Sequence, residues 1–167
     1  INQSFITNFL GRIDFTEDKR YTLSDTTKSI LKDTENVMYI TIFLDGDLPS
    51  GFQRLRQSAI DMARDMSRIS NGNIKVNIIN PKDGSAQEQQ ELTAALIDRG
   101  LQPTNLSVKN SSGFSQNLIF PYAIVNKGEE EINVHLLQNK IGLSPEQVLN
   151  NSIQNLEYGF ISAIKKL

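Results

Sequence analysis

Residues 37–44, Val-Met-Tyr-Ile-Thr-Ile-Phe-Leu, form a nearly continuous run of apolar, β-branched and aromatic side chains. Such a run is typical of a strand that is buried on both faces of a sheet. Asp45-Gly46-Asp47 ends the run, and Pro49 suits the first turn of a helix. From there to Ile69 apolar side chains recur every three or four residues, which indicates a helix with one apolar face. The stretch predicts a buried strand followed by a long helix.

The rest of the chain shows further strand and helix patterns. The expected elements are a strand at 74–80, a helix at 85–100 with a capping box of Ser85 and Glu88, an extended connection at 101–117 with a short strand at 106–109, two strands at 118–125 and 131–137 around a hairpin turn, and a last helix from Ser144 to Leu167.

This order of elements predicts an α/β fold with a mixed four-stranded sheet and flanking helices. A strand–helix–strand unit gives a parallel pair of strands, and the later hairpin adds antiparallel strands. This is the order of the thioredoxin-like fold, which we expect over residues 34–167. We interpret residues 1–33 as an N-terminal arm and a short helix that Ser24 caps.

Composition excludes several kinds of chemistry. The chain has 167 residues, a formal net charge of −2, no cysteine and one histidine, His135. Without cysteine there is no CxxC pair, thiol catalysis or thiolate metal site. The charge is not that of a protein that binds phosphates, so we expect no nucleic-acid partner. Phosphate-binding loops, the GxGxxG pattern and the GxSxG elbow are also missing. We therefore expect no enzyme, no metal and no cofactor.

The stretch from Leu118 to Glu129 resembles the part of thioredoxins where a proline precedes the third strand. In that family the peptide bond before the proline is cis. The resemblance implies a cis bond between Phe120 and Pro121, against a frequency of about 5% for X–Pro bonds in folded proteins. A trans proline on an edge strand is the alternative interpretation.

Asp45 and Asp47 follow the first strand, at the edge of the sheet where ligands gather in open α/β folds. Two carboxylates fall short of the six to eight oxygens that Ca²⁺ prefers, so a polar turn is the better interpretation for them. Leu48, Pro49 and Phe52 are candidates to present apolar area on the same surface. The predicted partner-binding residues are Asp45, Asp47, Leu48, Pro49, Phe52 and Pro121.

Two longer motifs carry a resemblance to a known family. They are residues 12–24, RIDFTEDKRYTLS, and residues 46–55, GDLPSGFQRL. In this order and spacing they resemble the gliding-associated ABC transporter component GldG, usually described as a substrate-binding or auxiliary subunit. The resemblance implies a membrane-anchored protein of Bacteroidetes that works with the permease and ATPase subunits of a transporter. This segment would then be its first extracytoplasmic domain, on the periplasmic face of the inner membrane, and other envelope proteins are further candidate partners.

The first motif has mixed charge. We interpret its residues as a segment that orders itself by ion pairs and by packing of the tyrosine, and that fixes the domain relative to the membrane. These residues are Arg12, Asp14, Lys19, Arg20 and Tyr21.

Three hypotheses for function follow. We expect first a non-enzymatic interaction domain that binds protein partners or transported material through the surface near residues 45–52 and Pro121. The alternative is a solute receptor, which needs a concave, mostly apolar pocket of about 300 Å³ or more with convergent polar groups. An enzyme is the least expected of the three, because signatures of a nucleophile, a base and a metal are missing.

Overall fold

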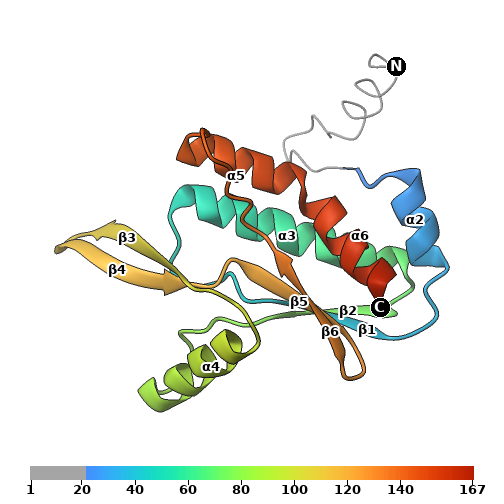
Figure 1. Ribbon diagram of the computed structural model, residues 1–167, viewed down its shortest axis with the longest axis horizontal. Helices are drawn as coiled ribbons and strands as arrows, with labels where there is room; N and C mark the ends of the chain where they lie inside the picture. The colour runs from blue at the N-terminus through green and yellow to red at the C-terminus, as the bar shows by residue number, and fades with distance from the viewer. Residues whose placement is uncertain (1–21) are drawn as a thin grey trace.

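The structure, a computed structural model, describes residues 22–167 (Figure 1). The predicted arm and the five motif residues Arg12, Asp14, Lys19, Arg20 and Tyr21 lie outside the described residues. The elements are α2 (Asp25–Lys32), β1 (Met38–Ile42), α3 (Ser50–Ile69), β2 (Ile74–Ile78), α4 (Ala86–Asp98), β3 (Thr104–Asn110), β4 (Gly113–Ile119), β5 (Tyr122–Lys127), β6 (Glu130–His135), α5 (Pro145–Gln154) and α6 (Leu156–Lys166).

The main sheet has four strands in the order β2-β1-β5-β6. β1 is parallel to β2, with Ile40 opposite Val76, and antiparallel to β5, with Ile40 opposite Val125. β5 and β6 form an antiparallel hairpin. The mixed α/β sheet with flanking helices, in the strand order of a thioredoxin-like fold, is confirmed.

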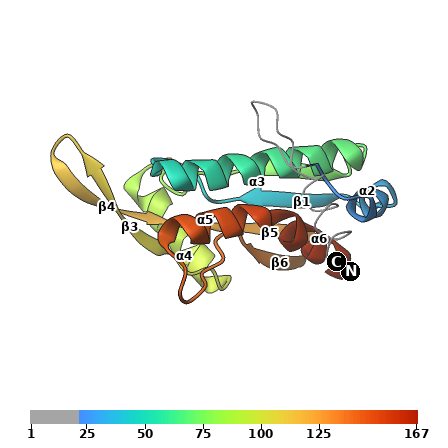
Figure 2. The same cartoon turned by 90° about the horizontal axis from the view of Figure 1, so that it is seen from above.

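Helices cover the two faces of this sheet unequally (Figures 1 and 2). α3, α5 and α6 lie on one face, where the main hydrophobic core forms around Ile40, Leu55 and Phe160. α4 lies on the other face, over a smaller core. The buried residues of this smaller core are Phe43, Leu96, Leu101, Phe120, Tyr122 and Ile124. α2 places Leu31 in the main core, so this helix packs on the same body as the sheet.

The predicted helix starts are confirmed by their hydrogen bonds. The Ser24 hydroxyl accepts from the Thr27 N–H at the start of α2. Ser85 and Ser144 begin α4 and α5, each within a complete capping box. α3 is different, because Pro49 precedes it and supplies no side-chain cap. Each serine satisfies an N–H group that the first turn of a helix otherwise leaves without a partner.

The interpretation of residues 101–117 as an extended connection is wrong, although the short strand expected at 106–109 is confirmed as part of β3. β3 and β4 pair in register, from Thr104 opposite Ile119 to Asn110 opposite Gly113, and form a separate two-stranded sheet. The expected strand at 118–125 is also two strands, because Phe120 and Pro121 lie between β4 and β5. Serine and asparagine dominate the hairpin, and such residues in a row are typical of a loop.

The last helix is divided at Asn155 into α5 and α6. The Asn155 amide donates to the Asn151 carbonyl at 2.7 Å, and the Ser152 hydroxyl donates to the Val148 carbonyl at 2.7 Å. Short polar side chains that bond the backbone of the previous turn often bend helices. The apolar periodicity continues through the division, so it does not reveal the break.

Pro121 overturns the expectation of a cis bond. No peptide bond among residues 22–167 is cis, so Phe120–Pro121 is trans, as in the alternative interpretation. Pro121 stands immediately before β5, where its missing N–H removes no ladder hydrogen bond from the sheet. Its carbonyl accepts from the Leu136 N–H at 3.0 Å. The chain therefore passes from β4 into β5 with a trans peptide bond before Pro121. Trans is also the lower-energy isomer of an X–Pro bond.

Candidate functional site

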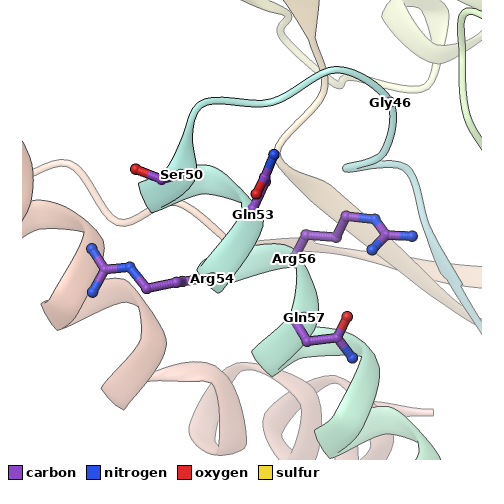
Figure 3. A pocket seen from close by; sticks show the side chains of 6 residues that line it. All are labelled: Gly46, Ser50, Gln53, Arg54, Arg56 and Gln57. Carbon is purple, nitrogen blue, oxygen red and sulfur yellow. The ribbon is translucent and has the colours of Figure 1, made fainter.

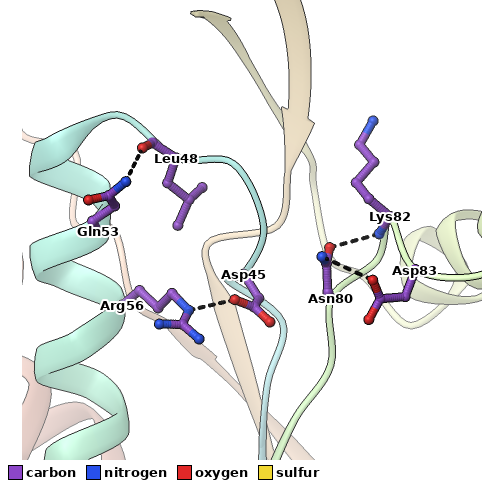
Figure 4. A network of polar contacts seen from close by, with 7 residues as sticks. All are labelled: Asp45, Leu48, Gln53, Arg56, Asn80, Lys82 and Asp83. Carbon is purple, nitrogen blue, oxygen red and sulfur yellow. Dashed lines mark hydrogen bonds and ion pairs between the residues drawn. The ribbon is translucent and has the colours of Figure 1, made fainter.

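The loop between β1 and α3 is fixed to the helix by an ion pair (Figure 4). Arg56 Nε donates to Asp45 Oδ1 at 2.6 Å. The two side chains are 29% and 23% exposed, so water screens the pair only in part. Because Asp45 lies in the loop and Arg56 in the second turn of α3, the pair fixes the start of the loop relative to the helix.

Two further hydrogen bonds fix the rest of the loop. The Gln53 amide donates to the Leu48 carbonyl at 2.8 Å, and the Asn117 amide of β4 donates to the Asp47 carbonyl at 2.6 Å. The Leu48 side chain is buried in the main core. The loop is therefore held from α3, from β4 and from the core beneath it.

The loop after β2 meets the same region. Asn80 Oδ1 accepts from the Lys82 N–H at 2.9 Å, and Asn80 Nδ2 donates to Asp83 Oδ1 at 3.3 Å (Figure 4). Gly46 adopts a φ of +104°, and a Cβ added there would lie 3.1 Å from Asn80 Oδ1. The ends of the two parallel strands thus bring two loops into contact, with glycine at the closest approach.

The predicted partner-binding residues have different surroundings. Asp47 is exposed and Asp45 is engaged by Arg56. Pro49 and Phe52 are half-buried, and Phe52 packs against the main core.

The expectation that Leu48 presents apolar area is wrong, because its side chain is only 5% exposed. Pro121 comes close to the end of β1, where the Phe43 N–H donates to the Tyr122 carbonyl, but Pro121 is buried as well. An apolar side chain in a loop next to a core gains more by turning inward than by facing water.

An open hollow of about 500 Å³ lies beside the loop (Figure 3). Its lining residues are Gly46, Ser50, Gln53, Arg54, Arg56 and Gln57. Arg56 extends toward the loop, whereas Arg54 points to the other side of the helix (Figure 3). Arg54 is exposed and has no ion-pair partner within residues 22–167.

Gln53, Arg54 and Gln57 are not among the binding residues predicted from the sequence. Their signal is their spacing, because Ser50, Gln53, Arg54 and Gln57 share the polar side of α3 directly after the candidate loop. From the sequence alone, this side of α3 is typical of a solvent-exposed helix face. Only the folded structure shows that the loop after β1 lies next to it.

Two of the remaining sequence features, metal-ligating side chains and the single histidine, can be placed in the part of the chain that the structure describes. No group of three or more His, Asp or Glu side chains there is placed to hold a metal ion. His135 is exposed on β6, and its ring centroid lies 4.8 Å from that of Tyr122. Among the same residues, no helix is both long and apolar enough to span a bilayer.

Fold and site together define a cysteine-free, thioredoxin-like α/β domain with a fixed loop at the end of its first strand. Residues 17–126 match the model of a family described as a domain of unknown function, DUF7088, and the chain belongs to this family. The match contains the loop, the hollow and the β3–β4 hairpin, and it ends within β5. No curated protein and no solved structure matches the chain.

Proposed function

We propose that this chain is a non-enzymatic interaction domain that binds protein partners through the loop after β1 and the first two turns of α3. The observation that supports this most directly is the rigid attachment of the loop. Asp45, Asp47 and Leu48 are each held by a contact from another element. A surface that is ordered before it binds loses less conformational entropy on association.

Exposed polar groups on this surface indicate the chemistry of the partner. Asp47, Gln53, Arg54 and Gln57 are all exposed. The guanidinium of Arg54 is available as a donor, and a carboxylate is the group that it binds most strongly. We therefore expect the partner to present an acidic side chain to Arg54.

A solute receptor is the second candidate, because the hollow exceeds the size of about 300 Å³ at which ligand pockets begin. Its shape favours the first candidate. Ligand pockets enclose about 70–90% or more of the surface of a drug-sized ligand, whereas this hollow is open. An open hollow suits contact with a protein surface.

The place of the domain in the cell belongs to the same proposal. The segments at 12–24 and 46–55 resemble GldG, so we propose an accessory subunit of an ABC transporter linked to gliding motility. The protein partners would be its permease and ATPase subunits or other envelope proteins, met at the periplasmic face of the inner membrane. Arg12, Asp14, Lys19, Arg20 and Tyr21 would orient the domain relative to that membrane.

Photo-crosslinking in cells tests the proposal. A photoreactive amino acid replaces Gln57 of the full-length protein, and mass spectrometry identifies the products. Gln87 is the matched control, because both side chains are exposed glutamines on helices that donate to an acidic residue one turn later, Asp61 and Glu91 respectively. We expect protein adducts from position 57 that are absent from position 87.

The variant Arg54→Gln sharpens the test. It keeps an amide donor but removes the charge, so we expect it to reduce the yield of adducts at position 57 several-fold. Equal adducts at positions 57 and 87, or none at 57, would overturn the docking surface. Adducts with a small molecule or a polysaccharide at position 57 would support the receptor instead.

A further inference from the structure

The β3–β4 hairpin stands apart from the main sheet. It forms its own two-stranded sheet and extends away from the body of the domain (Figures 1 and 2). Its base contacts the body of the domain: Ile119 is buried in the main core, Leu106 packs against it, and Asn117 donates to the Asp47 carbonyl. A two-stranded sheet has two free edges, and strands need more than one neighbour for independent stability.

The free edge of β4 lacks the usual protection against pairing. Natural edge strands carry charges, prolines or bulges. β4, with the sequence GFSQNLI, has neither a charged residue nor a proline, and its register with β3 is unbroken. β3 differs, because Lys109 lies on it. β4 is therefore the edge that is open to another strand.

The register identifies the backbone groups on this edge. Asn110 and Gly113 face each other across a two-residue turn, so they are a hydrogen-bonded pair of the hairpin. In an antiparallel ladder hydrogen-bonded and non-hydrogen-bonded pairs alternate. The N–H and C=O groups of Phe114, Gln116 and Leu118 consequently point away from β3, toward the free edge.

We infer that β4 pairs with β4 of a second copy of this chain, antiparallel and centred on Gln116. This register places Gln116 opposite Gln116 and Phe114 opposite Leu118 of the second copy. All three residues then use backbone groups that the hairpin leaves free, and their side chains share one face. The contact is isologous, as in most homodimers, and it joins two hairpins into one four-stranded sheet.

An apolar groove receives the exposed aromatic ring in this arrangement. Phe114 is 76% exposed, which is unusual for a phenylalanine. Leu118 lines a groove of about 440 Å³ together with Ala94 and Ile97 of α4, and Ile97 is 49% exposed. Leu118 is the β4 residue among those that line the groove, and no β3 residue is among them. Phe114 of the second copy, placed opposite Leu118, enters this groove and covers Ile97.

The absence of charge on β4 favours a second copy as the occupant. A strand related to itself by a two-fold axis places each central side chain against its own kind, and like charges directly opposite each other are destabilising. With Gln116 on the axis, the amides of the two copies can donate to and accept from each other. The dimer does not use the loop after β1, so it is independent of the proposed docking surface.

Sedimentation velocity with the 167-residue chain over a range of concentrations tests the inference. We expect a reversible dimer. Gln116→Lys alone and Gln116→Glu alone should each raise the dissociation constant about fivefold, because like charges meet on the axis. An equimolar mixture of the two variants should restore dimerisation. Ser107→Lys is the control, since it lies opposite Gln116 within the same hairpin but away from the axis, and it should leave the dimer intact.

Gln116→Pro is a second, independent variant. It removes an N–H on the free edge without removing a hydrogen bond of the hairpin, so circular dichroism should stay unchanged while the dimer is lost. A wild-type chain that remains monomeric at all concentrations would overturn the inference. So would a dimer that persists in both Gln116→Pro and Gln116→Lys, because its contact must then lie elsewhere.

Discussion

Arg56 and Asp45, 11 residues apart in the chain, form an ion pair of 2.6 Å between the second turn of α3 and the loop that precedes the helix. The pair differs from Arg68–Asp65, which joins neighbouring turns of α3 at 3.5 Å and is largely exposed on the arginine side. Only the first pair connects two elements. The position of the loop therefore depends on Arg56.

Replacing Arg56 by Gln should lower the free energy of unfolding by about 1 kcal/mol, because a charge-assisted hydrogen bond at a partly screened site is lost. Urea denaturation measures the change. In a double-mutant cycle with Asp45→Asn, the two effects should not add, since both remove the same contact. Arg68→Gln, as the control, should change stability by less than about 0.5 kcal/mol. Equal losses for Arg56→Gln and Arg68→Gln would contradict the role of the pair.

Gly46→Ala should destabilise the domain by about 1–3 kcal/mol. The φ of +104° at Gly46 is unfavourable for a residue with a Cβ. The new methyl group would also crowd Asn80 Oδ1 at 3.1 Å. Gly72→Ala is the comparison, because Gly72 also has a positive φ but nothing within 4 Å of an added Cβ. Thermal melts should show the larger loss for Gly46, and the reverse order would show that crowding by Asn80 is unimportant.

Leu31→Ala should lower the free energy of unfolding by about 2–5 kcal/mol, because it empties a fully buried position in the main core. The unfolding transition should remain a single one, since α2 shares this core with α3 and the sheet. Ile141→Ala is the control, as this side chain is fully exposed and should have little effect. An additional unfolding transition of Leu31→Ala at lower denaturant concentration would instead indicate that α2 unfolds independently of the sheet.

Ser144→Ala should cost about 0.5–2 kcal/mol of stability. The change removes the oxygen that accepts from the Gln147 N–H and breaks the capping box of α5. Ser50→Ala is the matched control, because Ser50 begins α3 without acting as a side-chain cap. Chemical denaturation should give a lower free energy of unfolding for Ser144→Ala than for Ser50→Ala, with a difference larger than the experimental error. A loss of equal size in Ser50→Ala would point to a general effect of serine on helix starts.

Sequence patterns predicted those parts of the fold whose physical cause lies within a few residues. The apolar run at 37–44 and the periodicity of 49–69 predicted β1 and α3, and the serines at 85 and 144 predicted two helix starts. In each case the deciding interaction is a hydrogen bond or a repeat that spans one turn. Within the β3–β4 hairpin only the short strand at 106–109 was predicted, where Leu106 and Val108 alternate with polar residues. β4 was missed, because its sequence GFSQNLI carries no such repeat.

The candidate site was only partly predictable, for the same reason. Polar residues follow β1 in the sequence, and they made the loop after this strand the candidate site. Whether Leu48 faces water or the core depends on where the core lies, and whether Asp45 is free depends on the path of α3. The amide of Asn117, 70 residues from Asp47, completes the loop only because the hairpin brings it there.

The amino-acid sequence by itself determined the features that depend on neighbouring residues. These are the buried strand, the turn with Gly46 that ends it, the amphipathic helices and their caps. Tertiary structure alone decided the burial of Leu48, the ion pair of Asp45 with Arg56 and the free edge of β4. The physical reason is range. Propensity, capping and periodicity act within a turn of helix or a pair of strand residues, whereas burial and pairing depend on neighbours that only the folded chain brings together.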